Sequence, residues 1–98
     1  LGTFDDSKRD TTRISIGQVE QALEMYKIKK NKYPKSLSDA AKYMRNQEVP
    51  KDAWGNDFEY TSSSSCGKDY EIVSYGRDGK KGGSDNDADI SSCSSDDE

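Results

Sequence analysis

The sequence contains no histidine among its 98 residues. A serine nucleophile therefore lacks its usual general base, so we interpret the run Ser62–Ser65 as a solvated loop and expect no enzyme activity. Apolar residues are also scarce, at 30% against 35% charged residues. The core of this single small domain must be modest, and such domains commonly need a disulfide, a metal ion or self-association to stay folded.

Cysteine is limited to Cys66 and Cys93. A disulfide between them would close a loop around a predicted strand and the acidic segment that follows it. The alternative is a pair of free, buried thiols, whereas a four-ligand zinc site is excluded because two thiols have no histidine to complete it. We favour the disulfide, which implies an oxidising compartment, either periplasmic or extracellular.

Long apolar runs are missing as well. No window approaches the roughly 18 apolar residues of a membrane-spanning helix, and no pattern typical of a signal peptide opens the chain. If the compartment is oxidising, residues upstream of Leu1 must direct export. We therefore expect the chain to be a processed or truncated form.

Clustered, unopposed positive charge is also absent, which argues against a nucleic-acid partner. Residues 1–60 carry eleven basic and ten acidic side chains, whereas residues 61–98 carry four and nine. The run Lys27–Lys32 is the one basic patch, and we interpret it as the favourable C-terminal end of a helix.

A long amphipathic helix is predicted over about residues 7–32. Apolar side chains recur there at the spacing of one helix face: Ile16, Val19, Leu23 and Tyr26. The helix should end near Asn31, which tolerates left-handed geometry, because Pro34 forbids continuation.

The remaining elements are shorter. A helix is plausible over about residues 38–45, with Ser36 or Ser38 as its N-cap and with a buried side made of Leu37, Ala41 and Met44. Two short aromatic and β-branched runs, "AWGNDFEYT" and "DYEIVSYG", then predict a β-hairpin over about residues 57–75. We expect the polar tail, residues 94–98, to be disordered. This order predicts an α+β fold in which a small antiparallel sheet packs on part of the long helix.

The segment Gly76–Ile90, "GRDGKKGGSDNDADI", is rich in aspartate and glycine. Calcium takes six to eight oxygen ligands, and glycines let a backbone fold tightly around an ion. The candidate carboxylates are Asp78, Asp85, Asp87 and Asp89. The alternative is a solvated acidic loop whose charge is balanced by Arg77, Lys80 and Lys81. A P-loop is excluded by the glycine spacing, and the carboxylates would repel a phosphate.

Two common calcium motifs do not fit this segment. An EF-hand begun at Asp85 places Ile90 where the turn glycine is required and Asp96 where the terminal glutamate is required. The calcium β-roll needs several stacked repeats, and this chain has one partial copy, "GGSDNDADI". Neither motif therefore accounts for the aspartates.

Three segments in order resemble the major pseudopilin of bacterial type II secretion systems, a relative of type IV pilins. They are "VEQALEMYKIKKNKYPKSL", "VPKDAWGNDFEY" and "DYEIVSYGRDGKKGGSDNDADI". The first looks like the end of that family's long helix and its Tyr-Pro turn. The second is similar to its Pro-x-Asp-x-Trp-Gly-Asn segment, and the third to its strand and loop ending in Ala-Asp-Ile.

The resemblance implies a pilin-like fold and a structural role. Such a subunit self-associates into a helical filament, the pseudopilus, in the periplasm and drives folded proteins through the outer membrane. Its partners are minor pseudopilins and inner-membrane secretion components. Family members are anchored in the inner membrane before assembly by an N-terminal hydrophobic helix, and we expect this chain to be the domain without it. The alternatives are a type IV pilin or pilin-like fibre subunit and a secreted calcium-binding module.

The resemblance also implies a calcium loop over residues 76–93. Carried over by position, its ligands are the backbone carbonyls of Tyr75 and Lys80 and the carboxylates of Asp78, Asp87 and Asp89. Ser84 and Asp85 stand where the family usually has glutamate and glycine, and they are further candidates.

Overall fold

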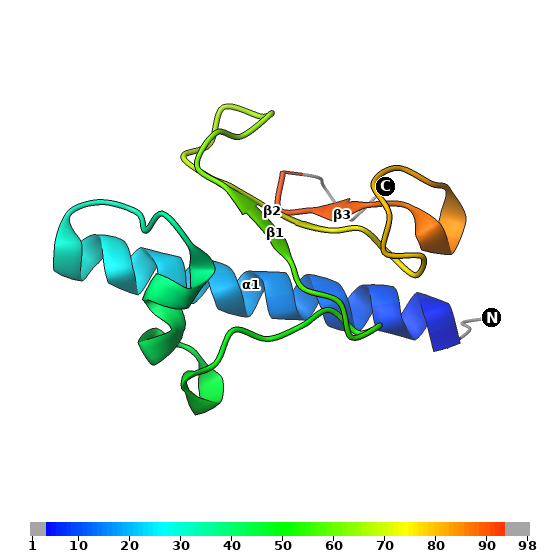
Figure 1. Cartoon of the computed structure of the whole chain (residues 1–98), viewed down its shortest axis with the longest axis horizontal. Helices are drawn as coiled ribbons and strands as arrows, with labels where there is room; N and C mark the ends of the chain where they lie inside the picture. The colour runs from blue at the N-terminus through cyan, green and yellow to red at the C-terminus, as the bar shows by residue number, and fades with distance from the viewer. Residues whose placement is uncertain (1–3, 94–98) are drawn as a thin grey trace.

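A long helix lies along one side of a small antiparallel sheet in the computed structural model, which describes residues 4–93 (Figure 1). The predicted α+β class is therefore confirmed. The elements in chain order are α1 (Phe4–Lys30), the 3-10 helices η1 (Leu37–Tyr43) and η2 (Arg45–Gln47), β1 (Glu59–Thr61), β2 (Glu71–Ser74), the 3-10 helix η3 (Asp85–Asp87) and β3 (Ile90–Ser91).

Helix α1 buries the apolar face that the sequence predicts. Ile16, Val19 and Leu23 are buried, and Tyr26 packs against them at the edge of the core. The helix begins three residues before the predicted start and ends at Lys30. Asn31 follows in the left-handed conformation at φ 66° and donates its backbone N–H to the carbonyl of Lys27 at 2.7 Å. The helix thus ends as expected ahead of Pro34.

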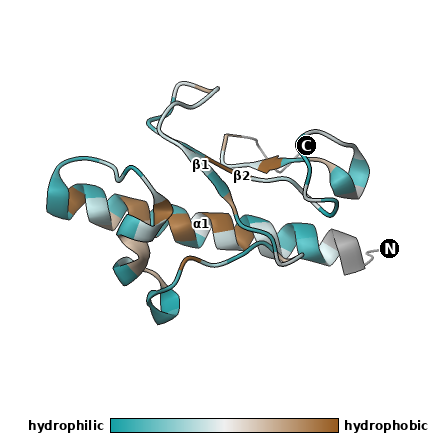
Figure 2. Ribbon diagram, in the orientation of Figure 1, coloured by the Kyte–Doolittle hydropathy of each residue, from teal (hydrophilic) through white to brown (hydrophobic). Residues whose placement is uncertain are grey.

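The core lies between α1, the sheet and η1, where the apolar part of α1 faces the other elements (Figure 2). Leu23 and Ile72 are fully buried, and burial of such a side chain contributes about 1.5–3 kcal/mol. The core residues are Ile16, Val19, Ala22, Leu23, Leu37, Ala40, Met44, Phe58, Tyr70, Ile72 and Ile90. None of the helices described over residues 4–93 could span a lipid bilayer.

The short helix expected over about residues 38–45 is a 3-10 helix, η1, followed after Met44 by η2. Leu37 and Met44 are buried as predicted, but Ala40 takes the place assigned to Ala41. A 3-10 helix has three residues per turn, so the next residue on the same inner face as Leu37 lies three positions later, at Ala40, rather than four. Ser36 holds the N-cap position without a side-chain cap hydrogen bond.

The sheet has the order β1–β2–β3, with both pairs antiparallel. Tyr60 lies opposite Ile72 in the first pair, and Ile90 lies opposite Ser74 in the second. The hairpin corresponds to the predicted one, whereas β3 falls inside the segment predicted as loop. A strand of two residues is too short to show the alternation that predicts strands. The expected disorder of residues 94–98 lies outside the described residues.

Candidate functional site

The acidic loop, defined here as residues 76–89, joins β2 to β3. Because these strands pair through Val73 with Ser91 and Ser74 with Ile90, both ends of the loop are held by one sheet. The loop lies above the N-terminal half of α1 (Figure 1), and η3 within it contacts the helix. Arg9 of α1 donates from Nη1 to the carbonyl of Ala88 at 2.8 Å. Helix α1 therefore holds the loop in addition to the two strands at its ends.

A buried hydrogen-bond network fixes the start of the loop. Asp52 is 4% exposed and Ser74 is 0% exposed. Ser74 Oγ donates to Asp52 Oδ2 at 2.7 Å and accepts the backbone N–H of Gly76 at 3.2 Å. Asp52 Oδ1 accepts the backbone N–H groups of Trp54 at 3.0 Å and Asn56 at 2.9 Å. One carboxylate thus shapes its own turn and positions the first residue of the loop.

Two glycines let opposite sides of the loop touch. Gly76 has φ +80°, and a Cβ there would lie 2.7 Å from the carbonyl oxygens of Asp87 and Ala88. Gly83 has φ +88°, and its Cβ would lie 2.6 Å from the same oxygen of Asp87. Cβ atoms do not approach backbone this closely, so the loop can close around Asp87 only with glycine at both positions.

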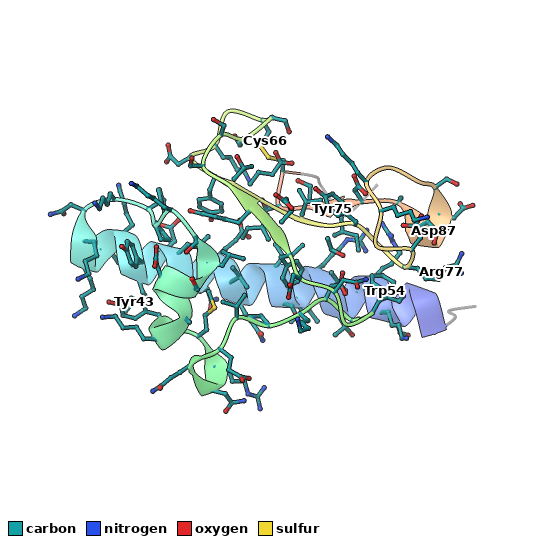
Figure 3. The ribbon with its side chains drawn as sticks, in the orientation of Figure 1. Tyr43, Trp54, Cys66, Tyr75, Arg77 and Asp87 are labelled. Atoms are coloured by element: carbon teal, nitrogen blue, oxygen red, sulfur yellow. A yellow bond between two sulfur atoms is a disulfide. The ribbon has the colours of Figure 1, made fainter. Side chains whose placement is uncertain are left out.

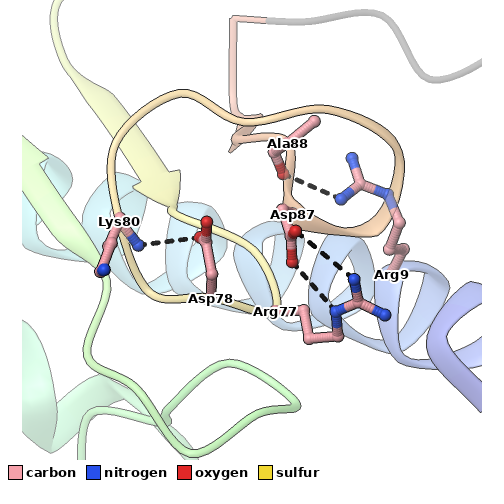
Figure 4. Close-up of polar contacts among 6 residues, drawn as sticks. All are labelled: Arg9, Arg77, Asp78, Lys80, Asp87 and Ala88. Carbon is pink, nitrogen blue, oxygen red and sulfur yellow. Dashed lines mark hydrogen bonds and ion pairs between the residues drawn. The ribbon is translucent and has the colours of Figure 1, made fainter.

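The predicted carboxylate ligands have partners of their own within the loop. Asp78 Oδ1 accepts the backbone N–H of Lys80 at 3.0 Å (Figure 4). Asp89 Oδ1 accepts the backbone N–H of Gly82 at 3.0 Å. Asp87 pairs with Arg77, whose Nε lies 3.0 Å from Oδ1 and whose Nη2 lies 3.4 Å from Oδ2. These contacts order the loop through its own donors.

The other predicted ligands are spread along the same loop. Tyr75 and Lys80 lie on either side of the turn closed by the 3.2 Å hydrogen bond from Gly79 N–H to the carbonyl of Gly76. Tyr75 lines a pocket together with Asp89, and burial, followed by the charges of Glu59 and Asp89, raises the pKa of its phenol. Ser84 and Asp85 are exposed at the start of η3.

The chemistry of the loop suits a hard cation, since its candidate donors are carboxylate and carbonyl oxygens. The described part of the chain, however, contains no group of three or more acidic side chains gathered closely enough to hold a metal ion. Asp78, Asp87 and Asp89 would have to turn from their present partners to bind one. The ligand set therefore stays a prediction.

The disulfide predicted from the sequence is present between Cys66 and Cys93, with their Cα atoms 5.8 Å apart. It joins the β1–β2 connection, where Figure 3 shows Cys66, to the chain just after β3. Glu71 of β2 reinforces this junction: its carboxylate accepts the hydroxyl of Ser91 at 2.6 Å and the backbone N–H of Ser65 at 3.0 Å. The Ser91 contact, followed by the Ser65 contact, lowers the pKa of Glu71 below its usual 4.5.

Sequence reasoning missed the residues that support the loop. In the sequence, Asp52 stood out only as part of the segment that resembles the pseudopilin family. Its side chain accepts the N–H groups of the residues two and four positions later, which is typical of an Asx turn. Nothing in the sequence connects Arg9 with Ala88, because 79 positions separate them.

The comparisons with known proteins agree on one family. The family model described as type II secretion system protein G matches residues 1–93. A type II secretion system core protein G from Pseudomonas aeruginosa is 30% identical over 102 aligned residues, covering 88% of this chain and 71% of the relative. The one from Vibrio cholerae is 30% identical over 105 residues, covering 92% of this chain and 71% of that relative. The one from Klebsiella michiganensis is 29% identical over 98 residues, covering 84% of this chain and 68% of that relative.

Proposed function

Because this chain belongs to the type II secretion system protein G family, we propose that it is the periplasmic domain of a pseudopilus subunit, with a structural rather than an enzymatic role. The single observation that carries the proposal is the family match, which extends over residues 1–93. In this role copies of the full-length protein assemble into a filament that drives folded proteins through the outer membrane. Its partners are further copies, minor pseudopilins and inner-membrane secretion components, and the protein is anchored in the inner membrane before assembly.

An exposed apolar side of α1 supports self-association. Ile14, Met25 and Ile28 are exposed, although large apolar side chains are scarce in this chain. Ile14 and Met25 are eleven residues apart and Ile14 and Ile28 fourteen, which are about three and four helical turns. They therefore lie on one side of α1, and a second copy of the protein would cover them in a filament.

Genetic complementation tests this role. In a strain that lacks its own protein G, the full-length protein should restore export of a type II substrate to the medium. Ile28→Gln should reduce both export and cross-linking between copies, because it removes an apolar contact from the exposed side of α1. Lys29→Gln is the matched control at the neighbouring exposed position, and it should leave both nearly unchanged. Wild-type protein that reaches the envelope without restoring export would contradict the proposal.

We also propose that the acidic loop binds calcium, which would act as a stabilising ion. Asp78, Asp87 and Asp89 would supply carboxylate oxygens, with the carbonyls of Tyr75 and Lys80 as further ligands. The support is the hard-oxygen chemistry of the loop and the way in which β2, β3 and the glycines hold its ends together. Preorganised ends reduce the ordering that ion binding must offset.

Thermal unfolding tests the calcium proposal. Asp78→Ala should lower the melting temperature in millimolar calcium but change it little in chelator, where the aspartate accepts an exposed hydrogen bond from the Lys80 N–H. Asp69→Ala is the matched control, since Asp69 is an exposed aspartate outside the loop. Equal melting temperatures of the wild type in calcium and in chelator would show that calcium does not stabilise the protein.

A further inference from the structure

We propose that the basic turn after α1, residues 31–35, docks on the outer face of the sheet in a second copy of the protein. The basic turn supplies Lys32 and Lys35. The sheet of the other copy supplies Glu59 and Glu71. The inference rests on the self-association part of the proposed function, to which it adds the two surfaces that meet.

The charge of the basic turn is not explained by the helix before it. Lys27, Lys29 and Lys30 lie in the last turn of α1, where the helix dipole stabilises a cation. Lys32 and Lys35 lie beyond the end of α1 and are exposed. Among residues 4–93, neither of these two lysines forms an ion pair. Two positive charges are therefore available to a partner outside the chain.

The basic turn is held in one conformation by its tyrosine and its proline. Tyr33 donates its hydroxyl to Glu24 of α1 at 2.8 Å, and its ring meets that of Tyr70 edge-on at 5.1 Å. Tyr60 of β1 donates its hydroxyl to the carbonyl of the buried Pro34 at 2.7 Å. Docking therefore requires little further ordering of the backbone between the two lysines.

The outer face of the sheet is the side opposite the core that the sheet forms with α1 (Figure 1). Ile72 and Ser74 of β2 are buried. Side chains alternate along a strand, so Glu71 and Val73 point to the outer side. Glu59 of β1 lies opposite Val73. A groove of about 380 Å³ follows this face, and the lining residues that matter for binding are Glu59, Glu71, Val73, Tyr75, Lys81 and Asp89.

The groove is acidic. It contains the carboxylates of Glu59, Glu71 and Asp89 together with one ammonium, that of Lys81. Glu59 is exposed, and its carboxylate accepts no hydrogen bond from the described part of the chain. The donors to Glu71, among them the Ser91 hydroxyl at 2.6 Å, are neutral, so they orient its carboxylate without cancelling its charge. Negative charge therefore prevails in the groove and attracts a cationic side chain.

The same groove suits the shape of a lysine. Val73 and Tyr75 line it with partly exposed apolar surface. A lysine buries its methylene stem along such surface while its ammonium stays at a polar group. A lysine of the basic turn can thus lie with its stem on these two residues and its ammonium at the glutamates.

A second copy accounts for both surfaces at once. The basic turn lies at the C-terminal end of α1, whereas the outer face of the sheet is directed away from α1, so the two surfaces of one chain do not meet (Figure 1). A contact between two different surfaces of identical subunits repeats from copy to copy, and it builds an open filament when the rotation does not close a ring. An anionic membrane or a separate acidic protein would bind the basic turn but leave the groove empty. The observations therefore favour a second copy as the partner.

Zero-length cross-linking in cells that produce the full-length protein tests the contact. A water-soluble carbodiimide joins a lysine amine to a neighbouring carboxylate with loss of water, so only groups in contact are linked. The wild type should give a dimer in which Lys32 or Lys35 is joined to Glu59 or Glu71. Mass spectrometry of the digested dimer identifies the linked residues.

A charge swap tests whether this pairing drives association. An amine-reactive cross-linker, which uses lysines throughout the chain, measures the yield of dimer. The double variant Lys32→Glu with Lys35→Glu should lower this yield by about two- to tenfold, since two exposed ion pairs are replaced by repulsion. Adding Glu59→Lys to the same chain should recover part of the loss, because opposite charges then meet again. The matched control is Lys8→Glu with Lys29→Glu, which reverses two other exposed lysines and should leave the yield nearly unchanged.

Three results would overturn the inference while leaving self-association intact: dimers linked through other residues, a yield that the charge reversal lowers no more than the control does, or no recovery in the swapped chain. A carbodiimide product that joins the basic turn to a different protein would also overturn it. If the wild type gives no dimer with either reagent, self-association fails together with the inference. Complementation of export reports separately on the pseudopilus role.

Discussion

Ser74 donates its hydroxyl to Asp52 across 2.7 Å, and both side chains are almost completely withdrawn from solvent. The contact joins the last residue of β2 to the segment that precedes β1, 22 positions earlier. Since Ser74 also accepts the N–H of Gly76, the acidic loop begins from a point fixed in the interior. The position of an exposed loop therefore depends on a buried carboxylate elsewhere in the chain.

Ser74→Ala should lower the free energy of unfolding by about 1–3 kcal/mol, the usual result of leaving buried polar groups unpaired. The change removes the donor to Asp52 and the acceptor of the Gly76 N–H. Urea denaturation measures the loss, with exposed Ser62→Ala as the control. If the two variants prove equally stable, the network contributes nothing to folding.

Gly76→Ala should destabilise the protein more than Gly82→Ala does. Both residues have positive φ, which costs a residue with a Cβ about 1–2 kcal/mol. A Cβ at Gly82 meets no atom within 4 Å, whereas at Gly76 it would press on the carbonyls of Asp87 and Ala88. Overpacking of this kind adds about 1–3 kcal/mol. Chemical denaturation of the two variants in chelator measures the difference, and equal losses would refute the close approach of the two sides of the loop.

Reduction of the Cys66–Cys93 disulfide should lower the free energy of unfolding by about 3–4 kcal/mol, the chain-entropy value for a bridge across 27 positions. The reason is that the bridge restricts the unfolded chain. Denaturation with and without a thiol reductant measures the effect, and the double variant Cys66→Ser with Cys93→Ser should match the reduced wild type. A reductant effect that persists in the double variant would point to a cause other than the bridge.

The stabilising effect of Glu71 should disappear in acid. The pKa of Glu71 is lowered in the folded protein, so the folded state favours the ionised carboxylate. Its contribution to the free energy of unfolding is therefore fully present above the usual pKa of 4.5. It is lost as the pH falls through the lowered pKa of the folded state. The stability difference between the wild type and Glu71→Gln should therefore shrink as pH falls below about 4.5. Denaturant midpoints at pH 3 to 7 measure this difference. A constant difference across that range would exclude the effect.

The sequence predicts the parts of this fold that depend on periodicity. The stripe from Ile16 to Leu23 predicts the buried face of α1, and Asn31 with Pro34 predicts its end. The two residues of β3 could not be predicted, because they form a strand only by pairing with β2. Ala40 was missed for a different reason: the choice between a 3-10 and an α-helix depends on packing, which decides whether i+3 or i+4 faces the core.

The candidate site was predictable in composition but not in geometry. The aspartates and glycines of the loop are evident in the sequence, and so is the possibility that basic residues balance the acidic charge. That Arg77 in particular meets Asp87 follows from where Gly76 and Gly83 let the backbone touch. Long-range contacts such as Arg9 with Ala88 depend on the docking of the whole loop on α1, which local patterns do not encode.

The disulfide turns residues 66–93 into a covalent ring that contains β2, the acidic loop and β3. Lys80 and Lys81 are exposed within this ring, where trypsin can reach them. A single cut after either lysine should open the ring without separating the two pieces, which would migrate as one species on a gel until a reductant is added. For a molecule cut only after Lys80 or Lys81, two bands without reductant would be incompatible with the bridge. With the bridge present, a protease that cuts the acidic loop once leaves the protein in one piece.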